Sequence, residues 1–196
     1  MAAQKLNADV RSDSDEEIAV LVQKGRDEEF AVLISRYEPK LLRYARKFLF
    51  DFDDAQDVVQ ETFIKAFRNI EGFDAGRKFS PWIYRIAHNE CVNFIKKNRI
   101  EKVPLFDLDV LFPHVPKEKH EDEKKFKQMK EILDASIGKL DIKYREPLLL
   151  YYIEGFDYRE IADILRVPVA TVGVRLSRGR KYLKSEYEKQ DKPAGL

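Results

Sequence analysis

Apolar residues recur every three or four positions along most of the chain, which is the spacing of amphipathic α-helices. Ser14 and Glu17 have the spacing of a capping box, so they predict the start of the first helix, and Gly25 predicts its end. A second helix is expected from about Asp27, with Pro39 breaking or restarting it. The pattern therefore predicts a helical N-terminal half.

Two further helices are predicted before residue 100. The acidic run 51–54 suits a helix start because its negative charges interact favourably with the positive end of the helix dipole. The apolar stripe that follows, which includes Phe63 and Phe67, is expected to be buried. Ser80 and Pro81 are typical of an N-cap and a first helical position, so the next helix is expected to begin there.

The helical periodicity lapses after residue 100, where Pro104, Pro113 and Pro116 occur among charges. It returns with Phe126 to Leu140, and further helices are expected over 148–153, 158–165 and from Val169 to about Tyr187. We therefore predict an all-α fold of two small helical domains. The expected limits are a disordered tail at 1–13, domains at 14–100 and 123–188, a flexible linker at 101–122, and a disordered tail at 189–196.

Composition narrows the function classes. The 196 residues carry a net charge of +1 and a single cysteine, so an internal disulfide is excluded and a reducing, cytoplasmic location is expected. No apolar run has the length of a membrane span, so direct membrane insertion is not expected. The sequence has no phosphate-binding glycine loop, nucleophile motif or metal-ligand set. We expect neither an enzyme nor a cofactor, a metal site or a small-molecule substrate.

Residues 155–180 have the pattern of a helix-turn-helix. Ile161 and Leu165 point inward in the first helix, which Asp157 is expected to cap, and residues 166–168 make the turn. The second helix carries five basic residues and no acidic residue between 169 and 184, as expected for a helix in the major groove. The alternative is a solvated helix in an ordinary helical hairpin.

Two other charged surfaces are predicted. Asp54, Asp57 and Glu61 share one helix face, which by itself favours a solvated acidic face at a helix start. The helix after Ser80 has a basic and polar outer face, suited to phosphates and unstacked bases. Trp82 on that helix is equally compatible with a core position or a DNA-facing one.

Three blocks of sequence resemble sigma factors of the sigma-70 family, in that family's order. Residues 54–63 (DAQDVVQETF) resemble the polymerase-binding segment of sigma domain 2, and residues 79–89 (FSPWIYRIAHN) resemble the segment after it. Residues 154–162 (EGFDYREIA) and 171–180 (TVGVRLSRGR) resemble domain 4. Because no room remains for the middle domain of larger sigma factors, the chain is similar to the extracytoplasmic-function (ECF, group IV) type.

The resemblance implies a transcription initiation factor that brings core RNA polymerase to promoters. Domain 2 would dock on the clamp coiled coil through Asp54, Asp57, Gln60, Glu61 and Phe63. It would read the −10 element with Arg77, Lys78, Phe79, Ser80, Trp82, Arg85, Asn89, Asn93 and Lys96, and the loop 69–79 would capture a flipped base. Domain 4 would sit on the flap and read the −35 element with Arg166, Ala170, Thr171, Val174, Arg175, Arg178 and Lys181. A membrane-bound anti-sigma factor is the usual partner in this family.

The resemblance also has limits. Many relatives have Lys-Ser where this chain has Gly173-Val174, and Arg166 stands where a helix-turn-helix often has glycine, so the −35 sequence is not predicted. The main alternative is a helix-turn-helix regulator that acts without docking on polymerase. It explains residues 155–180 but not the first hundred residues. A sigma mimic that blocks polymerase would keep the acidic face but not the basic ones.

Overall fold

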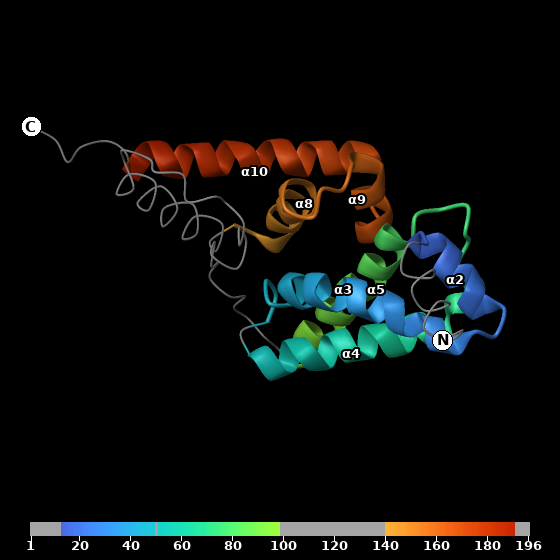
Figure 1. Cartoon of the computed structure of the whole chain (residues 1–196). Helices are drawn as coiled ribbons and strands as arrows, with labels where there is room; N and C mark the ends of the chain where they lie inside the picture. Colours follow the sequence, from blue (N-terminus) through green and yellow to red (C-terminus); the bar gives the residue numbers. More distant parts are fainter. Residues whose placement is uncertain (1–12, 50, 99–139, 191–196) are drawn as a thin grey trace, which may run out of the picture. The chain divides into compact units, whose positions relative to one another are not determined.

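The computed structural model describes residues 13–49, 51–98 and 140–190, and every regular element within them is helical. The chain divides into two compact units between Glu101 and Lys102. Each unit is described by itself, with its helices labelled as in Figure 1. The predicted linker, most of the predicted helix 126–140 and nearly all of both predicted tails lie outside the described residues.

Unit 1 contains, in its described part, four α-helices and two short 3-10 turns. The α-helices are α2 (Asp15–Gln23), α3 (Phe30–Ala45), α4 (Phe52–Arg68) and α5 (Phe79–Lys97); the turns are η1 (Asp27–Glu29) and η2 (Ile70–Gly72). α4 packs on both α3 and α5, and α2 packs on α3, α5 and η2 (Figure 1). This arrangement leaves the outer faces of α4 and α5 free for charged side chains.

Two helix starts in unit 1 agree with the predictions: the capping box of α2 and the acidic start of α4. Ser14 and Glu17 form the predicted capping box of α2, and Gly25 follows that helix with a positive φ of 85°. The Asp51 carboxylate caps α4 by accepting from the N–H groups of Asp53 and Asp54. These local contacts satisfy backbone donors that the helix itself leaves unpaired.

Two predictions about proline and serine were wrong. α3 runs through Pro39 without a break, because Pro39 is exposed while Leu33, Tyr37 and Leu41 bury the opposite face of the helix. α5 begins at Phe79 instead of after Ser80, and its N-cap Lys78 makes no side-chain cap bond. The Glu16 carboxylate from α2 accepts from the Phe79 N–H at 2.8 Å instead, which a local pattern does not reveal.

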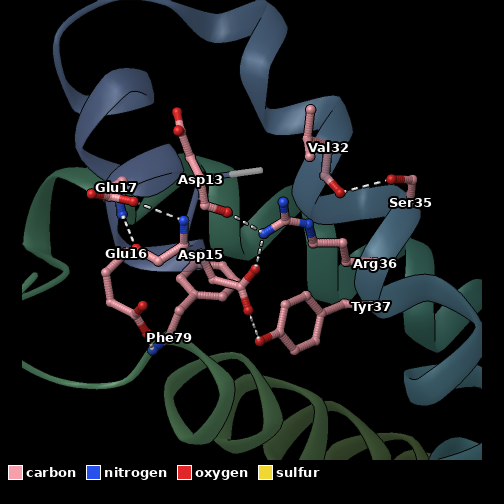
Figure 2. Close-up of polar contacts among 10 residues, drawn as sticks. Asp13, Asp15, Glu16, Glu17, Val32, Ser35, Arg36, Tyr37 and Phe79 are labelled. Atoms are coloured by element: carbon pink, nitrogen blue, oxygen red, sulfur yellow. Dashed lines mark hydrogen bonds and ion pairs between the residues drawn. The ribbon is translucent and has the colours of Figure 1, made fainter. Parts of the chain in front are cut away.

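A cluster of polar side chains fixes α2 against α3, as Figure 2 shows. The Asp15 carboxylate accepts from Arg36 Nη1 at 2.6 Å and from the Tyr37 hydroxyl. Arg36 Nη1 also donates to the Asp13 carbonyl at 2.9 Å. Burial, followed by the bond to Asp15, raises the pKa of Tyr37 far above its ordinary value, so this hydroxyl stays a donor.

Unit 2 consists, in its described part, of α8 (Ile142–Tyr152), α9 (Tyr158–Leu165) and α10 (Val169–Gln190). α10 packs on both α8 and α9 (Figure 1). α8 begins six residues before the predicted Leu148 and includes Pro147, because Asp141 caps it by accepting from the Lys143 N–H at 3.0 Å. Val172 and Leu176 are fully buried, as their predicted inward-facing stripe requires.

The close approach of α10 to α8 depends on Gly179. A Cβ atom at this position would lie 2.8 Å from Leu148 Cδ1 and 3.3 Å from the Tyr144 carbonyl oxygen. Gly173 lies on the same helix, but a Cβ there would meet only Tyr158, at 3.7 Å. The two glycines therefore have opposite expected sensitivities to alanine.

We predict that Gly179→Ala lowers the free energy of unfolding of unit 2 by about 1 kcal/mol or more, because overpacking exceeds the gain in helix propensity. Gly173→Ala should raise it by about 1 kcal/mol. Urea unfolding followed by circular dichroism measures both. Fluorescence of Trp82, the single tryptophan, follows unit 1 and should not change in either variant. Equal effects of the two substitutions would contradict the packing described.

Candidate functional site

The acidic face of α4 is formed as predicted by Asp54, Asp57 and Glu61, all of them exposed or half-buried. The pKa of Asp54 is raised above its ordinary value, first by partial desolvation and then by neighbouring carboxylates. Glu61 approaches Lys65 at 3.6 Å, and Lys65 also pairs with Glu90 of α5 at 2.6 Å. Like charges therefore accumulate at the start of α4, while the C-terminal part of the helix is tied to α5.

A groove with a volume of about 670 Å³ lies between α3 and α4 beside this acidic face. The groove is lined by three of the predicted polymerase-binding residues, Asp57, Gln60 and Phe63. Ile64 and Phe67 line it as well. Phe67 was predicted to be buried, but 38% of it is exposed, and Ile64 is 39% exposed. The surface is thus apolar as well as acidic, which the charge pattern alone did not indicate.

The outer face of α5 carries most of the predicted −10 residues. Asn89, Asn93 and Lys96 are exposed on it, Arg85 and Trp82 are half-buried, and Arg77 and Lys78 are exposed just before the helix. The half-buried ring of Trp82 lies 5.2 Å from that of Phe73 and 5.3 Å from that of Phe79. It therefore belongs to the edge of the core and still presents part of its surface.

Phe79 does not fit a direct DNA contact. Its side chain is fully buried against Tyr37, Phe73 and Trp82, with ring centroids 5.3–5.4 Å apart. The prediction of Phe79 as a DNA-binding residue is therefore corrected: it is a core residue that supports the neighbouring surface. Ser80 is half-buried and contributes a hydrogen bond to Tyr37.

α9 and α10 form the predicted helix-turn-helix. Asp157 and Glu160 make a reciprocal capping box at the start of α9. Arg166 ends that helix in the left-handed conformation, with φ 51° and ψ 49°, where glycine would be less strained. The sharp turn lets α10 start at Val169, three residues later.

The predicted −35 residues all reach the surface of the unit. Arg166, Ala170, Val174, Arg178 and Lys181 are exposed, whereas Thr171 and Arg175 are half-buried. Arg178 Nη1 lies 3.4 Å from the Tyr144 hydroxyl oxygen on α8. Arg180 is oriented differently: its Nη1 lies 3.4 Å from the Tyr152 hydroxyl oxygen, and this contact is the main cause of its raised pKa. The basic side chains of α10 therefore extend along two different flanks.

The described residues contain no candidate metal-binding site. Within residues 13–49, 51–98 and 140–190, no three His, Cys, Asp or Glu side chains gather in a metal-binding arrangement. None of the helices described there is long and apolar enough to cross a membrane.

The sequence matches two family models at the positions of the two units. Residues 33–100 match Sigma-70 region 2, and residues 130–183 match Sigma-70, region 4. The chain is 33% identical to the ECF RNA polymerase sigma factor SigW of Bacillus subtilis, over 84% of its own length and 92% of that protein. The chain belongs to the ECF sigma factors. It is therefore an alternative sigma factor, which binds core RNA polymerase and directs it to promoters.

Another ECF sigma factor and two solved structures are also similar to this chain over most of its length. The chain is 30% identical to the ECF RNA polymerase sigma-E factor of Escherichia coli over 89% of this chain and 95% of that one. The solved structure of CnrH in complex with the cytosolic domain of CnrY matches with a TM-score of 0.67 and 26% identity, covering 90% of this chain and 99% of that one. The sigma factor RpoE of Bartonella quintana, solved with the anti-sigma factor NepR, shares the fold at a TM-score of 0.62 and 22% identity, over 84% and 99% of the two chains.

The region 2 match decides against the alternative of a helix-turn-helix regulator without polymerase docking. That alternative accounts only for α9 and α10, whereas the match at 33–100 covers most of unit 1 of this sigma factor. The roles of individual surface residues stay predictions.

We predict that Asp57→Arg abolishes capture of core polymerase while the protein stays folded. Asp57 is an exposed member of the acidic face and also lines the groove, so a reversed charge opposes the partner but disturbs no core contact. Pull-down of purified core enzyme measures capture, and thermal unfolding measures folding. Glu28→Arg is the matched control, because it makes the same charge change at an exposed site outside α4. Capture of core enzyme by folded Asp57→Arg at the wild-type level would contradict the docking assignment.

Proposed function

We propose that this sigma factor docks on core polymerase through the joint surface of the α4 acidic face and the α3–α4 groove. The observation that carries the proposal is the combination of carboxylates with exposed Ile64 and Phe67 on one surface. An amphipathic helical partner, such as the clamp coiled coil, would bury the apolar side chains and complement the charge. The residues assigned to direct docking contacts are Asp54, Asp57, Gln60, Glu61, Ile64 and Phe67. Phe63 lines the groove but is only 7% exposed, so it is assigned a supporting role beneath this surface.

The −10 element is assigned to the outer face of α5 and the loop before it. Arg77, Lys78 and Lys96 are placed to contact phosphates, and the exposed part of Trp82 is placed to stack on a base. Arg85, Asn89 and Asn93 add polar groups along the same helix. Phe79 is left out of this set because its side chain is buried.

The −35 element is assigned to α10 and the turn before it. Arg175 and Arg178 lie near the N-terminal part of α8, where Lys143 and Tyr144 extend the same polar flank. Val174 is 50% exposed and offers an apolar contact to a thymine methyl group. Arg166, Ala170, Thr171 and Lys181 complete the surface, which the flap would hold in place on the promoter.

Two domains joined by a linker are part of the proposal. We assign 14–100 to domain 2, 101–122 to the linker and 123–188 to domain 4. The division between Glu101 and Lys102 into compact units supports the first of these limits. The promoter elements are then read by separately folded units.

An anti-sigma factor is the proposed regulator. RpoE of Bartonella quintana was solved with an anti-sigma factor, and this chain has the same fold. The α3–α4 groove exposes apolar side chains that a regulator would cover, and a protein bound there would exclude polymerase. The protein itself is proposed to act in the cytoplasm and to catalyse no reaction.

We predict that Arg175→Ala and Arg178→Ala each weaken holoenzyme binding at the −35 element without weakening capture of core polymerase. Each lost phosphate contact should lower the slope of log affinity against log salt by about 0.9. A lost bidentate base contact should reduce discrimination by roughly 1–3 kcal/mol. The measurement is holoenzyme affinity for an intact promoter and for one with a scrambled −35 element, at several salt concentrations.

Arg180→Ala is the matched control for this experiment. It removes the same charge from the same helix, but from the flank that faces Tyr152. We expect a smaller loss of −35 discrimination than in either of the other variants. If Arg175→Ala and Arg178→Ala keep wild-type affinity, salt slope and preference, α10 does not read DNA.

A further inference from the structure

The loop between α4 and α5 has fixed ends and an exposed tip. Residues 74–78 (DAGRK) are all exposed, while Phe73 before them and Phe79 after them are buried. Within the tip, the Gly76 N–H donates to Asp74 Oδ1 at 2.9 Å, and the Arg77 N–H donates to the Asp74 carbonyl at 2.9 Å. The tip therefore has its own turn, and its direction depends on what holds the two ends.

The first end is held by Gln23 of α2. Its Nε2 donates to the Ile70 carbonyl at 2.7 Å and to the Phe73 carbonyl at 2.8 Å. A glutamine amide has two N–H groups, so one side chain satisfies both carbonyls. These bonds link positions 47 and 50 residues apart in the sequence.

The second end is held by Glu16, in the first turn of the same helix. Its Oε1 accepts from the Phe79 N–H at 2.8 Å, where α5 begins. Because Lys78 makes no side-chain cap bond, Glu16 supplies the acceptor that an N-cap residue usually provides, and its charge also favours the helix start. Phe73 and Phe79, the residues on either side of the tip, are thus both bonded to α2.

α2 is itself fixed by the Asp15 contacts to Arg36 and Tyr37 shown in Figure 2. The Sigma-70 region 2 match begins at residue 33, so α2 lies before the matched segment. The positions of the loop ends therefore depend on side chains outside the region that the family model describes.

We propose that Glu16 and Gln23 are positioning residues that set the specificity of the −10 loop. By holding both ends, they keep the exposed tip in one arrangement before DNA arrives, so that less ordering is required when a base is captured. This inference rests on the proposed function of the 69–79 loop in reading the −10 element. It predicts that α2 affects base preference although neither side chain touches DNA.

The test compares variants of α2 in reconstituted holoenzyme. Gln23→Met is close in size but removes both donors, and Glu16→Leu removes the acceptor; Glu16→Gln keeps an acceptor oxygen. Glu17→Ala is the stability control, because it breaks the capping box of α2 without touching the loop. Base preference is measured as open-complex formation on a promoter chosen by run-off transcription, with each −10 base substituted in turn. Hydrogen exchange of amides 69–79 reports loop order.

Gln23→Met and Glu16→Leu should each lower −10 base preference about tenfold, the scale of one to two lost hydrogen bonds. Exchange of the loop amides should rise, while capture of core polymerase should not change. Glu16→Gln should restore most of the preference lost in Glu16→Leu, and Glu17→Ala should keep it. If Gln23→Met does not fold, as Trp82 fluorescence would show, the Glu16→Leu and Glu16→Gln pair decides the question.

Replacement of the exposed tip residues 74–78 with glycine and serine separates the two ways of failing. If this replacement lowers base preference but Gln23→Met and Glu16→Leu do not, the positioning role is wrong and the loop assignment stands. If the replacement also has no effect, the loop does not read the −10 element, and both proposals fail. A loss in Glu17→Ala as large as that in Gln23→Met would mean that stability alone is responsible, which also overturns the inference.

Discussion

The burial of Phe79 organises unit 1. Its ring contacts Tyr37 from α3, Phe73 from the preceding loop and Trp82 from its own helix, and its backbone N–H is bonded to Glu16 of α2. Edge and tilted contacts of this kind add to the free energy gained by removing the ring from water. Because one residue joins three helices and a loop, the start of α5 and the end of the loop have a single position. The outer face of α5 is oriented by this internal contact.

Each unit separates the side that packs from the charged side that is assigned to binding. In α4, Ala55 and Val59 are buried while Asp57 and Gln60 are exposed, and in α10 Leu176 is buried while Arg178 is exposed. The pKa of Asp54 is raised, first by desolvation and then by neighbouring carboxylates, so folding disfavours its charged form. The protonated form therefore stabilises the fold, and this stabilisation is lost as the pH rises through the raised pKa. A concentration of like charges that lowers the stability of the fold is better explained by binding to a partner than by a structural role.

Local signals predicted much of this structure. The capping box at Ser14, the cap at Asp157, the acidic start of α4 and the inward face of α10 follow from residues within a few positions of one another. The errors concern contacts between distant segments. The start of α5 depends on Glu16, which is 63 residues away, and the burial of the Phe79 ring depends in part on Tyr37 of α3. The exposure of Phe67 depends on the groove between α3 and α4 that it lines. Such contacts have no local sequence pattern, so single residues within the candidate surfaces were harder to predict than the surfaces themselves.

The central claim is that one chain carries both a polymerase-docking surface and promoter-reading surfaces. Run-off transcription with purified core polymerase on a pool of genomic promoters tests it most directly. The account predicts that adding this protein produces discrete transcripts that core enzyme alone does not make. The upstream sequences of those transcripts should share a −10 and a −35 element. Binding of the protein to promoter DNA in the absence of polymerase, with no new transcripts in its presence, would contradict the account.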